Sequence, residues 1–212
     1  MKIYAQTLYG RLVRAEPLNP SHYPGLKRAA KDPRIWRYML IDNGHAEGFD
    51  PWLEEMVKRQ EAGDIFPFTI IKADTGEVIG YCMFLNVSTV DERLEYGCVW
   101  YNPKYWGNNN GNNFTAEGTY LFQQFAFEVL KVRRWELRTE AQNRASNAAN
   151  RAMGATFEGI LRKEKLVRGK VYRDTSVWSI LSEEWPRNRQ KFEKHLGYAI
   201  PVSEMLGETN HY

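Results

Sequence analysis

The sequence offers little support for a metal site, a disulfide framework or a membrane span. Its 212 residues include two cysteines, Cys82 and Cys98, and four isolated histidines, with neither a CxxC pair nor an HExxH motif. No stretch approaches the ~18 consecutive apolar residues of a transmembrane helix, and the first residues lack the apolar core of a signal peptide. We therefore expect no metal, no membrane association and a cytoplasmic protein.

An excess of one charge is also missing. The 29 Lys and Arg residues are interspersed with 26 Asp and Glu residues, giving a net charge of +3. Nucleic-acid binding relies on a basic stripe, so we expect no nucleic-acid partner. The mild positive balance still suits a small anionic ligand. A length of 212 residues and 43% apolar residues are typical of one folded domain with an additional tail.

The order of the predicted elements indicates a mixed α/β sheet. Apolar, partly alternating runs predict strands at residues 11–18, 66–73, 78–87, 94–101, 135–139, 157–167 and 175–181. Helices are predicted at residues 20–30, 50–62, 115–130, 145–153 and 183–195, the second starting with an Asp50-Pro51 cap. We expect a main domain over residues 1–186. A surface helix and a loosely ordered tail are expected over residues 187–212.

The two cysteines lie within predicted strands. Buried, unreactive thiols are the simpler interpretation. If the strands at 78–87 and 94–101 form a hairpin turning near Val90, Cys82 and Cys98 would oppose each other, and a disulfide is the alternative.

The stretch Trp106-Gly107-Asn108-Asn109-Asn110-Gly111-Asn112-Asn113-Phe114-Thr115 lies between a predicted strand and a predicted helix. Glycine and asparagine tolerate positive φ, so this backbone can turn several N–H groups toward one point. The positive end of the helix dipole also favours a phosphate or pyrophosphate. On composition alone, a surface turn or a helix cap explains the stretch about equally well, because it matches neither GxGxxG nor GxxxxGK[ST].

Motifs on both sides of this loop resemble the GNAT superfamily of N-acetyltransferases. The resemblance to motif A lies in Tyr101-Asn102-Pro103, Tyr105-Trp106-Gly107 and Thr115-Ala116-Glu117. The resemblance to motif B lies in Asn143-Arg144-Ala145-Ser146, Met153-Gly154-Ala155 and Phe157-Glu158-Gly159. The ending Val177-Trp178-Ser179-Ile180-Leu181, followed by Glu184-Trp185-Pro186, is similar to the branch that contains ribosomal-protein alanine acetyltransferases. The resemblance covers about residues 10–186.

The resemblance implies a mostly antiparallel, twisted α/β sheet whose central strands, 94–101 and 135–139, splay apart and are flanked by helices. The cosubstrate would be acetyl-CoA, with its pantetheine arm pairing with the backbone of Val99, Trp100 and Tyr101. Asn143 and Ser146 would touch the pantetheine or thiol end, although capping of the following helix explains them as well. The pyrophosphate would contact the loop and helix start at Trp106, Gly107, Gly111, Asn112, Asn113, Phe114 and Thr115.

Two departures from the family pattern concern the site. Four extra residues, mostly asparagine, separate Trp106 from Glu117. Asn150 occupies the motif B position where many GNAT enzymes have a tyrosine general acid, and an asparagine cannot supply a proton.

The implied chemistry is direct attack of an amine on a thioester, which requires a base. Glu95 is the candidate base, against the alternative of a salt-bridged strand glutamate, and Glu140 is the second candidate. A main-chain N–H near Val99 or Trp100 would hold the oxyanion, and Ser146 or a water would replace the missing tyrosine.

We expect an N-acetyltransferase, monomeric or homodimeric, that acts on a small-molecule amine or amino acid. The acceptor would lie between residues 36–49, the Trp52 helix and residues 167–175, where aromatic side chains either stack on the ligand or form ordinary core. The alternatives are acetylation of a protein N-terminus and a catalytically weak acyl-CoA-binding module.

Overall fold

The computed structural model describes residues 3–40, 46–108 and 111–207. Its strands form one eight-stranded sheet in the order β1-β2-β3-β4-β5-β6-β8-β7. The strands are β1 (Leu8–Tyr9), β2 (Val13–Pro17), β3 (Phe66–Lys72), β4 (Val78–Ser88), β5 (Arg93–Tyr101), β6 (Arg134–Glu140), β7 (Thr156–Val167) and β8 (Val171–Leu181). All neighbouring strands are antiparallel except β5 and β6, which are parallel. The predicted mixed, mostly antiparallel sheet is confirmed.

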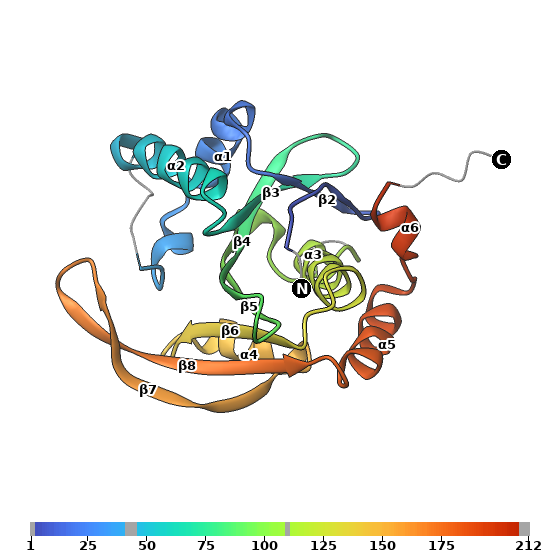
Figure 1. Ribbon diagram of the computed structural model, residues 1–212. Coiled ribbons are helices and arrows are strands. Elements are labelled where there is room, and N and C mark those ends of the chain that lie inside the picture. Colours follow the sequence, from blue (N-terminus) through green and yellow to red (C-terminus); the bar gives the residue numbers. More distant parts are fainter. Residues whose placement is uncertain (1–2, 41–45, 109–110, 208–212) are drawn as a thin grey trace.

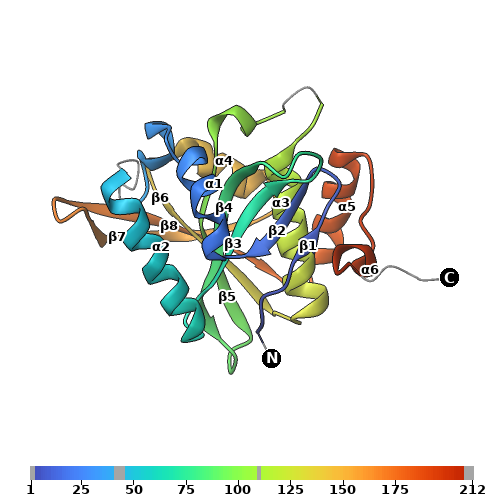
Figure 2. The same ribbon diagram turned by 90° about the horizontal axis from the view of Figure 1, so that it is seen from above.

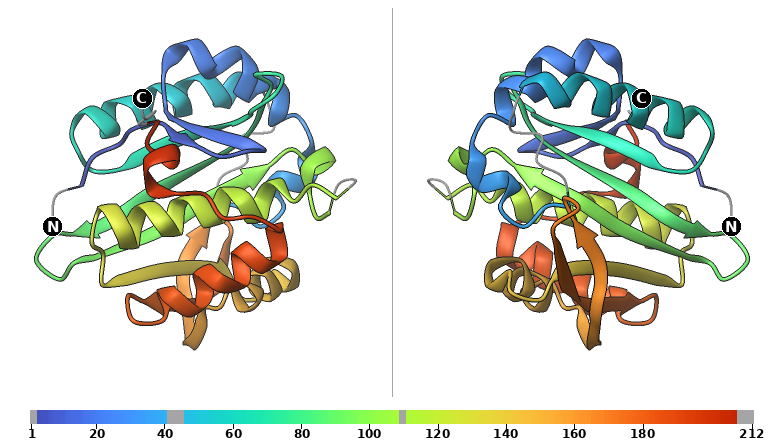
Figure 3. Two further views of the ribbon diagram at one scale, coloured as in Figure 1. Left: turned by 90° about the vertical axis from the view of Figure 1, so that its right-hand side faces the viewer. Right: turned by 90° about the vertical axis from the view of Figure 1, so that its left-hand side faces the viewer.

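Helices cover both faces of this sheet (Figures 1 and 3). The α-helices are α1 (Tyr23–Ala29), α2 (Ala46–Glu61), α3 (Phe114–Gln124), α4 (Arg144–Ala152), α5 (Trp185–Leu196) and α6 (Val202–Met205). Short 3-10 turns occupy Pro20–His22, Pro33–Trp36 and Pro103–Tyr105, and a π-helical turn, Phe125–Val129, follows α3. Helices α1 and α2 lie on one face, and α3 and α5 lie on the other (Figure 3). No helix among the described residues is long and apolar enough to cross a membrane.

Strand β4 lies between two hydrophobic cores. Its residues Cys82 and Phe84 belong to the core under α3, whereas Tyr81 and Met83 belong to the core under α1 and α2. Successive strand side chains point to opposite faces, so a strand covered on both faces is apolar throughout rather than alternating. This explains the continuous burial from residue 79 to residue 84.

The central strands separate after a short paired segment. Strand β5 pairs with β6 only at Arg93, Leu94 and Glu95. Beyond this point β5 contains a bulge: Met83 pairs with Gly97 but Tyr81 pairs with Trp100, and Cys98 has a φ of 52°. A bulge bends its strand and increases the local twist. The predicted splay of the two central strands is therefore confirmed.

The predicted β4–β5 hairpin is confirmed, but both cysteines are free. Cys82 packs in the core under α3, and Cys98 packs against the core under α1 and α2. The bulge thus directs the two thiols to opposite faces, and the alternative of a disulfide is wrong. Burial raises the pKa of the Cys98 thiol to about 12, which makes it a poor nucleophile.

The predicted starts of one helix and one strand are wrong, and so is the expectation of a loosely ordered tail up to Gly207. Helix α2 begins at Ala46 and contains Pro51, and the Asp50 carboxylate pairs with Lys27 of α1 rather than capping a helix start. Strand β8 begins at Val171 rather than at Thr175. The helix predicted over 115–130 is confirmed by α3 and the π-helical turn that continues it to Val129. The tail is ordered up to Gly207: it forms α6, and Ile200 and Met205 are buried in the core under α3. Residues 208–212 lie outside the described residues.

Candidate active site

The edge of β5 that faces β6 is open beyond the bulge. A Cβ atom on Gly80 of β4 would lie 2.5 Å from the Trp100 carbonyl oxygen, and the Asn102 N–H donates to the Ile79 carbonyl at 2.7 Å. Residues 100 and 102 therefore direct their backbone groups toward β4. Because these groups alternate along a strand, those of Val99 and Tyr101 face the other edge, where β6 has diverged. The Tyr101 carbonyl accepts a hydrogen bond from the Trp106 indole at 2.8 Å.

Two helices begin where the diverging strands end. Helix α3 follows β5, and helix α4 follows β6. Asn113 caps α3, with its Oδ1 accepting from the Ala116 N–H at 2.9 Å, and Asn143 caps α4 in the same way from the Ser146 N–H at 3.1 Å. The capping interpretation of Asn143 is confirmed. Each helix start also retains free N–H groups and the positive end of its dipole, so the splayed end of the sheet favours an anion.

The loop before α3 borders a small cavity. Gly107 and Gly111 have φ values of 68° and 85°, the left-handed backbone that glycine adopts without strain. Asn109 and Asn110 lie outside the described residues. The cavity has a volume of about 170 Å³ and is lined by Leu12, Asn108, Gly111, Asn112, Asn113, His195, Leu196 and Tyr198. Its position beside the start of α3 suits a phosphate group.

Two side chains at this cavity come from a segment where the sequence predicted only a surface helix and a tail. His195, at the end of α5, contacts the Asn113 amide nitrogen through its Nε2 at 3.0 Å. Tyr198 donates to Glu117 of α3, and the Arg11 guanidinium lies 4.3 Å from the centre of its ring. A motif search misses both residues, because they reach the loop only when α5 packs against α3.

The predicted cofactor residues differ in exposure. The exposed residues are Val99, Trp106, Gly107, Gly111 and Asn112, those of intermediate exposure are Asn113, Thr115, Asn143 and Ser146, and the buried ones are Trp100, Tyr101 and Phe114. The last three side chains pack in the hydrophobic cores. These three residues therefore have only backbone groups to offer a ligand.

Glu95 lies at the point where β5 and β6 separate. It is buried, with 7% of its surface exposed. The Asn86 amide donates to Glu95 Oε2 at 2.6 Å, and Arg138 Nε lies 3.5 Å from the same oxygen. Burial raises the pKa of Glu95, and the hydrogen bond from Asn86 and the charge of Arg138 counteract only part of this effect. A buried carboxylate with a raised pKa at a strand opening has the properties of a general base.

Charged groups connect Glu95 to the β7–β8 hairpin. Arg138 lies 3.7 Å from Glu136 and donates to Glu164 at 3.1 Å, and Glu164 accepts from the Thr175 hydroxyl at 2.8 Å. The second candidate base, Glu140, ends β6 opposite Thr175. Among residues 3–40, 46–108 and 111–207, no group of three His, Cys, Asp or Glu side chains is arranged to hold a metal ion.

Asn150 occupies the motif B position where the resemblance implies a tyrosine. Asn150 is buried, and its amide donates to the Thr139 hydroxyl of β6 at 3.0 Å. Asn150 thus fastens α4 to the sheet. Ser146, one turn earlier, is only partly buried.

The expected acceptor side is built largely from core aromatic residues. Trp36, Phe49, Trp52, Tyr81 and Trp100 form a closed series of ring contacts with centroids 5.1–6.2 Å apart. All except Trp52 are buried, so the core interpretation of the aromatic residues is confirmed for Trp36 and Phe49. The tip of the β7–β8 hairpin approaches this region, where Arg168 donates to the Trp36 carbonyl (Figure 1).

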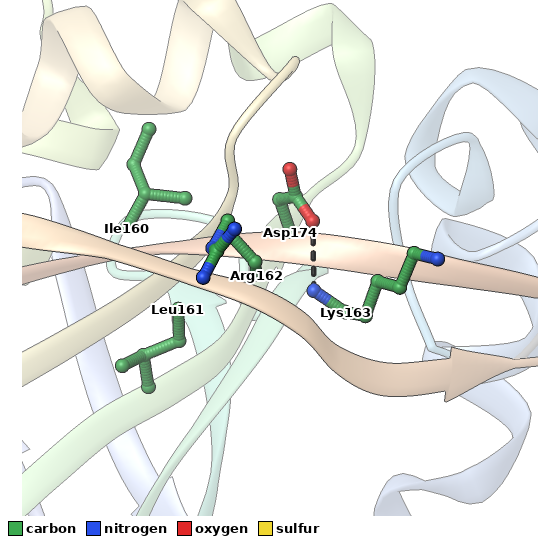
Figure 4. A pocket seen from close by; sticks show the side chains of 5 residues that line it. All are labelled: Ile160, Leu161, Arg162, Lys163 and Asp174. Atoms are coloured by element: carbon green, nitrogen blue, oxygen red, sulfur yellow. Dashed lines mark hydrogen bonds between the residues drawn. The ribbon is translucent and has the colours of Figure 1, made fainter.

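A larger hollow of about 640 Å³ lies along the β7–β8 hairpin and is lined by Ile160, Leu161, Arg162, Lys163 and Asp174 (Figure 4). Its carboxylate, Asp174, accepts the Lys163 backbone N–H at 2.8 Å. The hollow contains none of the predicted site residues. Seen from above, one end of the β7–β8 hairpin projects beyond the rest of the sheet (Figure 2).

Comparisons with known proteins agree with this geometry. A family model described as an acetyltransferase (GNAT) domain matches residues 13–156. An N-acetyltransferase named p20 from Bacillus licheniformis is 25% identical over 184 residues, covering 85% of this chain and 98% of that protein. The crystal structure of a GCN5-related N-acetyltransferase from Brucella melitensis superposes with a TM-score of 0.83 and 28% identity, covering 92% of this chain and 87% of that one. A ribosomal-protein-S5-alanine acetyltransferase from Vibrio fischeri shares the fold at a TM-score of 0.68 and 14% identity, over 84% and 98% of the two chains.

Proposed function

The chain belongs to the GNAT family of N-acetyltransferases, and we propose that it transfers the acetyl group of acetyl-CoA, by direct attack, to the primary amine of a small molecule or amino acid. GNAT enzymes use acetyl-CoA, so the donor follows from the family. The observation that supports the reaction most strongly is the position of Glu95, buried at the opening between β5 and β6.

The open edge of β5 supports the placement of the donor. The pantetheine arm would pair with the backbone of Val99 and Tyr101, which faces the gap left by β6. Of the two N–H groups expected near the thioester, that of Val99 faces the gap, whereas Trp100 directs its backbone groups toward β4. We therefore assign the oxyanion to the Val99 N–H.

The phosphates would lie at the other end of this edge. Asn113 at the start of α3, the turned backbone at Gly111, and Asn112 line the small cavity described above. Thr115 and Asn113 stabilise the first turn of α3 through a hydrogen bond of 3.0 Å between their side chains. Asn143 and Ser146, at the start of α4, would border the pantetheine from the opposite strand.

In the proposed reaction, the amine nitrogen attacks the thioester carbon while Glu95 accepts the amine proton. The C–N bond forms and the C–S bond breaks, releasing CoA as a thiolate that is protonated by water or through Ser146. Neither cysteine takes part, because direct attack needs no covalent enzyme intermediate.

The test combines free-thiol release from acetyl-CoA with a thermal shift produced by CoA. The panel includes amino acids, small primary amines and peptides with free N-termini. We expect CoA to raise the melting temperature and at least one small amine to release thiol. Turnover confined to peptides would replace the acceptor class with protein N-termini, and a CoA shift without any turnover would contradict acetyl transfer and favour a binding module.

A further inference from the structure

We propose that Asn86 and Gly97 orient the Glu95 carboxylate so that one defined oxygen, Oε1, receives the proton of the acceptor amine. The inference rests on the proposed role of Glu95 as the base. It assigns a positioning role to two residues that no motif of the sequence singles out.

Asn86 owes its direction to a second bulge. Leu85 pairs with Glu95 and Ser88 pairs with Arg93, so β4 has one more residue than β5 in this interval. Asn86 has a φ of 49°, a left-handed backbone that asparagine adopts more readily than most residues. A bulge redirects the side chains around it. Here it places the Asn86 amide 2.6 Å from Glu95 Oε2.

Gly97 leaves space beside the other oxygen of Glu95, Oε1. A Cβ atom on Gly97 would lie 3.2 Å from Glu95 Oε1 and 3.0 Å from Leu85 Cδ2. The φ of Gly97 is not in the left-handed region. The backbone therefore does not require glycine here, and the absent side chain matters through the space it leaves beside Oε1.

The two carboxylate oxygens of Glu95 have different neighbours. Asn86 and Arg138 both approach Oε2, and the remaining lone pairs of Oε1 lie beside Gly97. An amide that donates to one oxygen stabilises the ionised form needed for proton transfer without neutralising it. The amine proton then moves to Oε1 as the C–N bond forms and the thioester C–S bond breaks.

The other charged and titratable groups that act on Glu95 come from four strands: Cys98 on β5, Glu136 and Arg138 on β6, Glu164 on β7 and Arg173 on β8. Glu136 and Glu164 raise the pKa of Glu95, and Arg138 lowers it. Asn86→Gly leaves these groups in place, so its effect on the Glu95 pKa measures the contribution of the Asn86 amide.

The direct test is a carbon-13 NMR titration of the protein labelled at glutamate side-chain carboxyls, with the Glu95 signal assigned by its loss in Glu95→Gln. Asn86→Gly removes the amide yet keeps a residue that adopts positive φ, so the bulge is retained. We expect it to raise the pKa of Glu95 by about one unit, which corresponds to the loss of one hydrogen bond to a charged group. Asn86→Asp places a second carboxylate against Oε2 and raises this pKa further. Equal pKa values in wild type and Asn86→Gly would overturn the proposal.

The catalytic consequence is measured with the amine that releases most thiol in the panel. In Asn86→Gly, the acidic limb of the kcat/KM profile should move to higher pH by the same amount as the Glu95 pKa. A moved pKa with an unmoved limb would overturn the catalytic role of the contact. Failure of the proposed function is distinguishable, since wild type would then release no thiol at any pH.

Gly97 is tested by Gly97→Ala, with Val90→Ala in the β4–β5 connection as the control, because Val90 is 90% exposed. Gly97→Ala should lower kcat for the amine about tenfold or more, the loss expected for misplacing a general base, while the CoA-induced thermal shift stays unchanged. Val90→Ala should change neither kcat nor the CoA-induced thermal shift. Unaltered kcat in Gly97→Ala would overturn the role of the open space.

Discussion

Two glutamates of the same sheet, Glu95 on β5 and Glu158 on β7, have opposite electrostatic environments. Glu158 receives two hydrogen bonds from Arg134, at 2.7 and 2.5 Å, and one from Ser179 at 2.7 Å. These contacts, led by Arg134, lower the pKa of Glu158 to about 2. Glu95 is buried instead, receives one neutral amide, and has a raised pKa.

The difference shows that the partner, more than the residue type, decides what a strand carboxylate can do. A carboxylate held by both oxygens against a guanidinium stays ionised and accepts no proton at neutral pH. A buried carboxylate with one free oxygen is closer to the protonation equilibrium that a general base needs. Glu158 is a salt-bridged strand glutamate held at both oxygens. Glu95 also has an ion pair, with Arg138 Nε at 3.5 Å, but at Oε2 alone, so this alternative to the base stays open for Glu95.

The largest expected difference between the two glutamates is catalytic. Glu95→Gln should lower kcat by about 100-fold or more, the range for removing a general base. Glu158→Gln should leave kcat within about twofold, because its contacts are structural. Both variants are measured by thiol release with the same amine, and an equal loss in both would remove the distinction.

Substitutions of the arginines beside the two glutamates should have effects of intermediate size. Arg138→Gln removes the cation 3.5 Å from Glu95, which should raise the Glu95 pKa and move the acidic limb of kcat/KM to higher pH. A shift of one pH unit corresponds to about a tenfold loss at a fixed pH below the limb. Arg134→Gln should leave the limb in place, and a comparable shift in that variant would show that long-range charge, rather than contact, sets the pKa.

The smallest expected effect concerns stability. The lowered pKa of Glu158 means that its contribution is fully present above the unfolded value of 4.5 and is lost as the pH falls toward 2. With 36% of this side chain exposed, solvent screening limits the contribution to about 1 kcal/mol. Urea unfolding at pH 7 should show this loss in Glu158→Gln, and the loss should shrink at pH 4 and below.

The raised pKa of Glu95 predicts the opposite sign. Its carboxylate is ionised at a cost when the pH is above its folded-state pKa, so Glu95→Gln should be at least as stable as wild type at pH 8. The difference should diminish as the pH falls through the raised pKa and should be gone well below the ordinary value of 4.5, where the carboxyl group is protonated in both states. A marked destabilisation of Glu95→Gln at pH 8 would indicate a structural ion pair with Arg138 instead.

The sheet was largely predictable because its signals are local. Burial on both faces makes β4 a continuous apolar run, and Asn102-Pro103 ends β5 close to its predicted boundary. The helix start at Asp50-Pro51 was wrong because Asp50 is attracted to Lys27 of α1, a tertiary contact that a cap motif does not contain.

The candidate site was predictable only in part. Glu95 was predicted from the implied chemistry and Asn113 from the glycine- and asparagine-rich loop, but the partners that define their roles were not predicted. Asn86 reaches Glu95 through a one-residue bulge, and His195 reaches Asn113 through the packing of α5 on α3. The first contact depends on the register of β4 and β5, and the second depends on how α5 packs on α3. Neither can be predicted from the spacing of residues in the sequence.

The most direct test of the central claim is the pH dependence of kcat/KM for acetyl transfer in wild type and Glu95→Gln. We predict that wild type loses activity below the raised pKa of Glu95, and that Glu95→Gln is slow and lacks this acidic limb. A Glu95→Gln enzyme with the wild-type rate and an unchanged profile would contradict the assignment of Glu95 as the base.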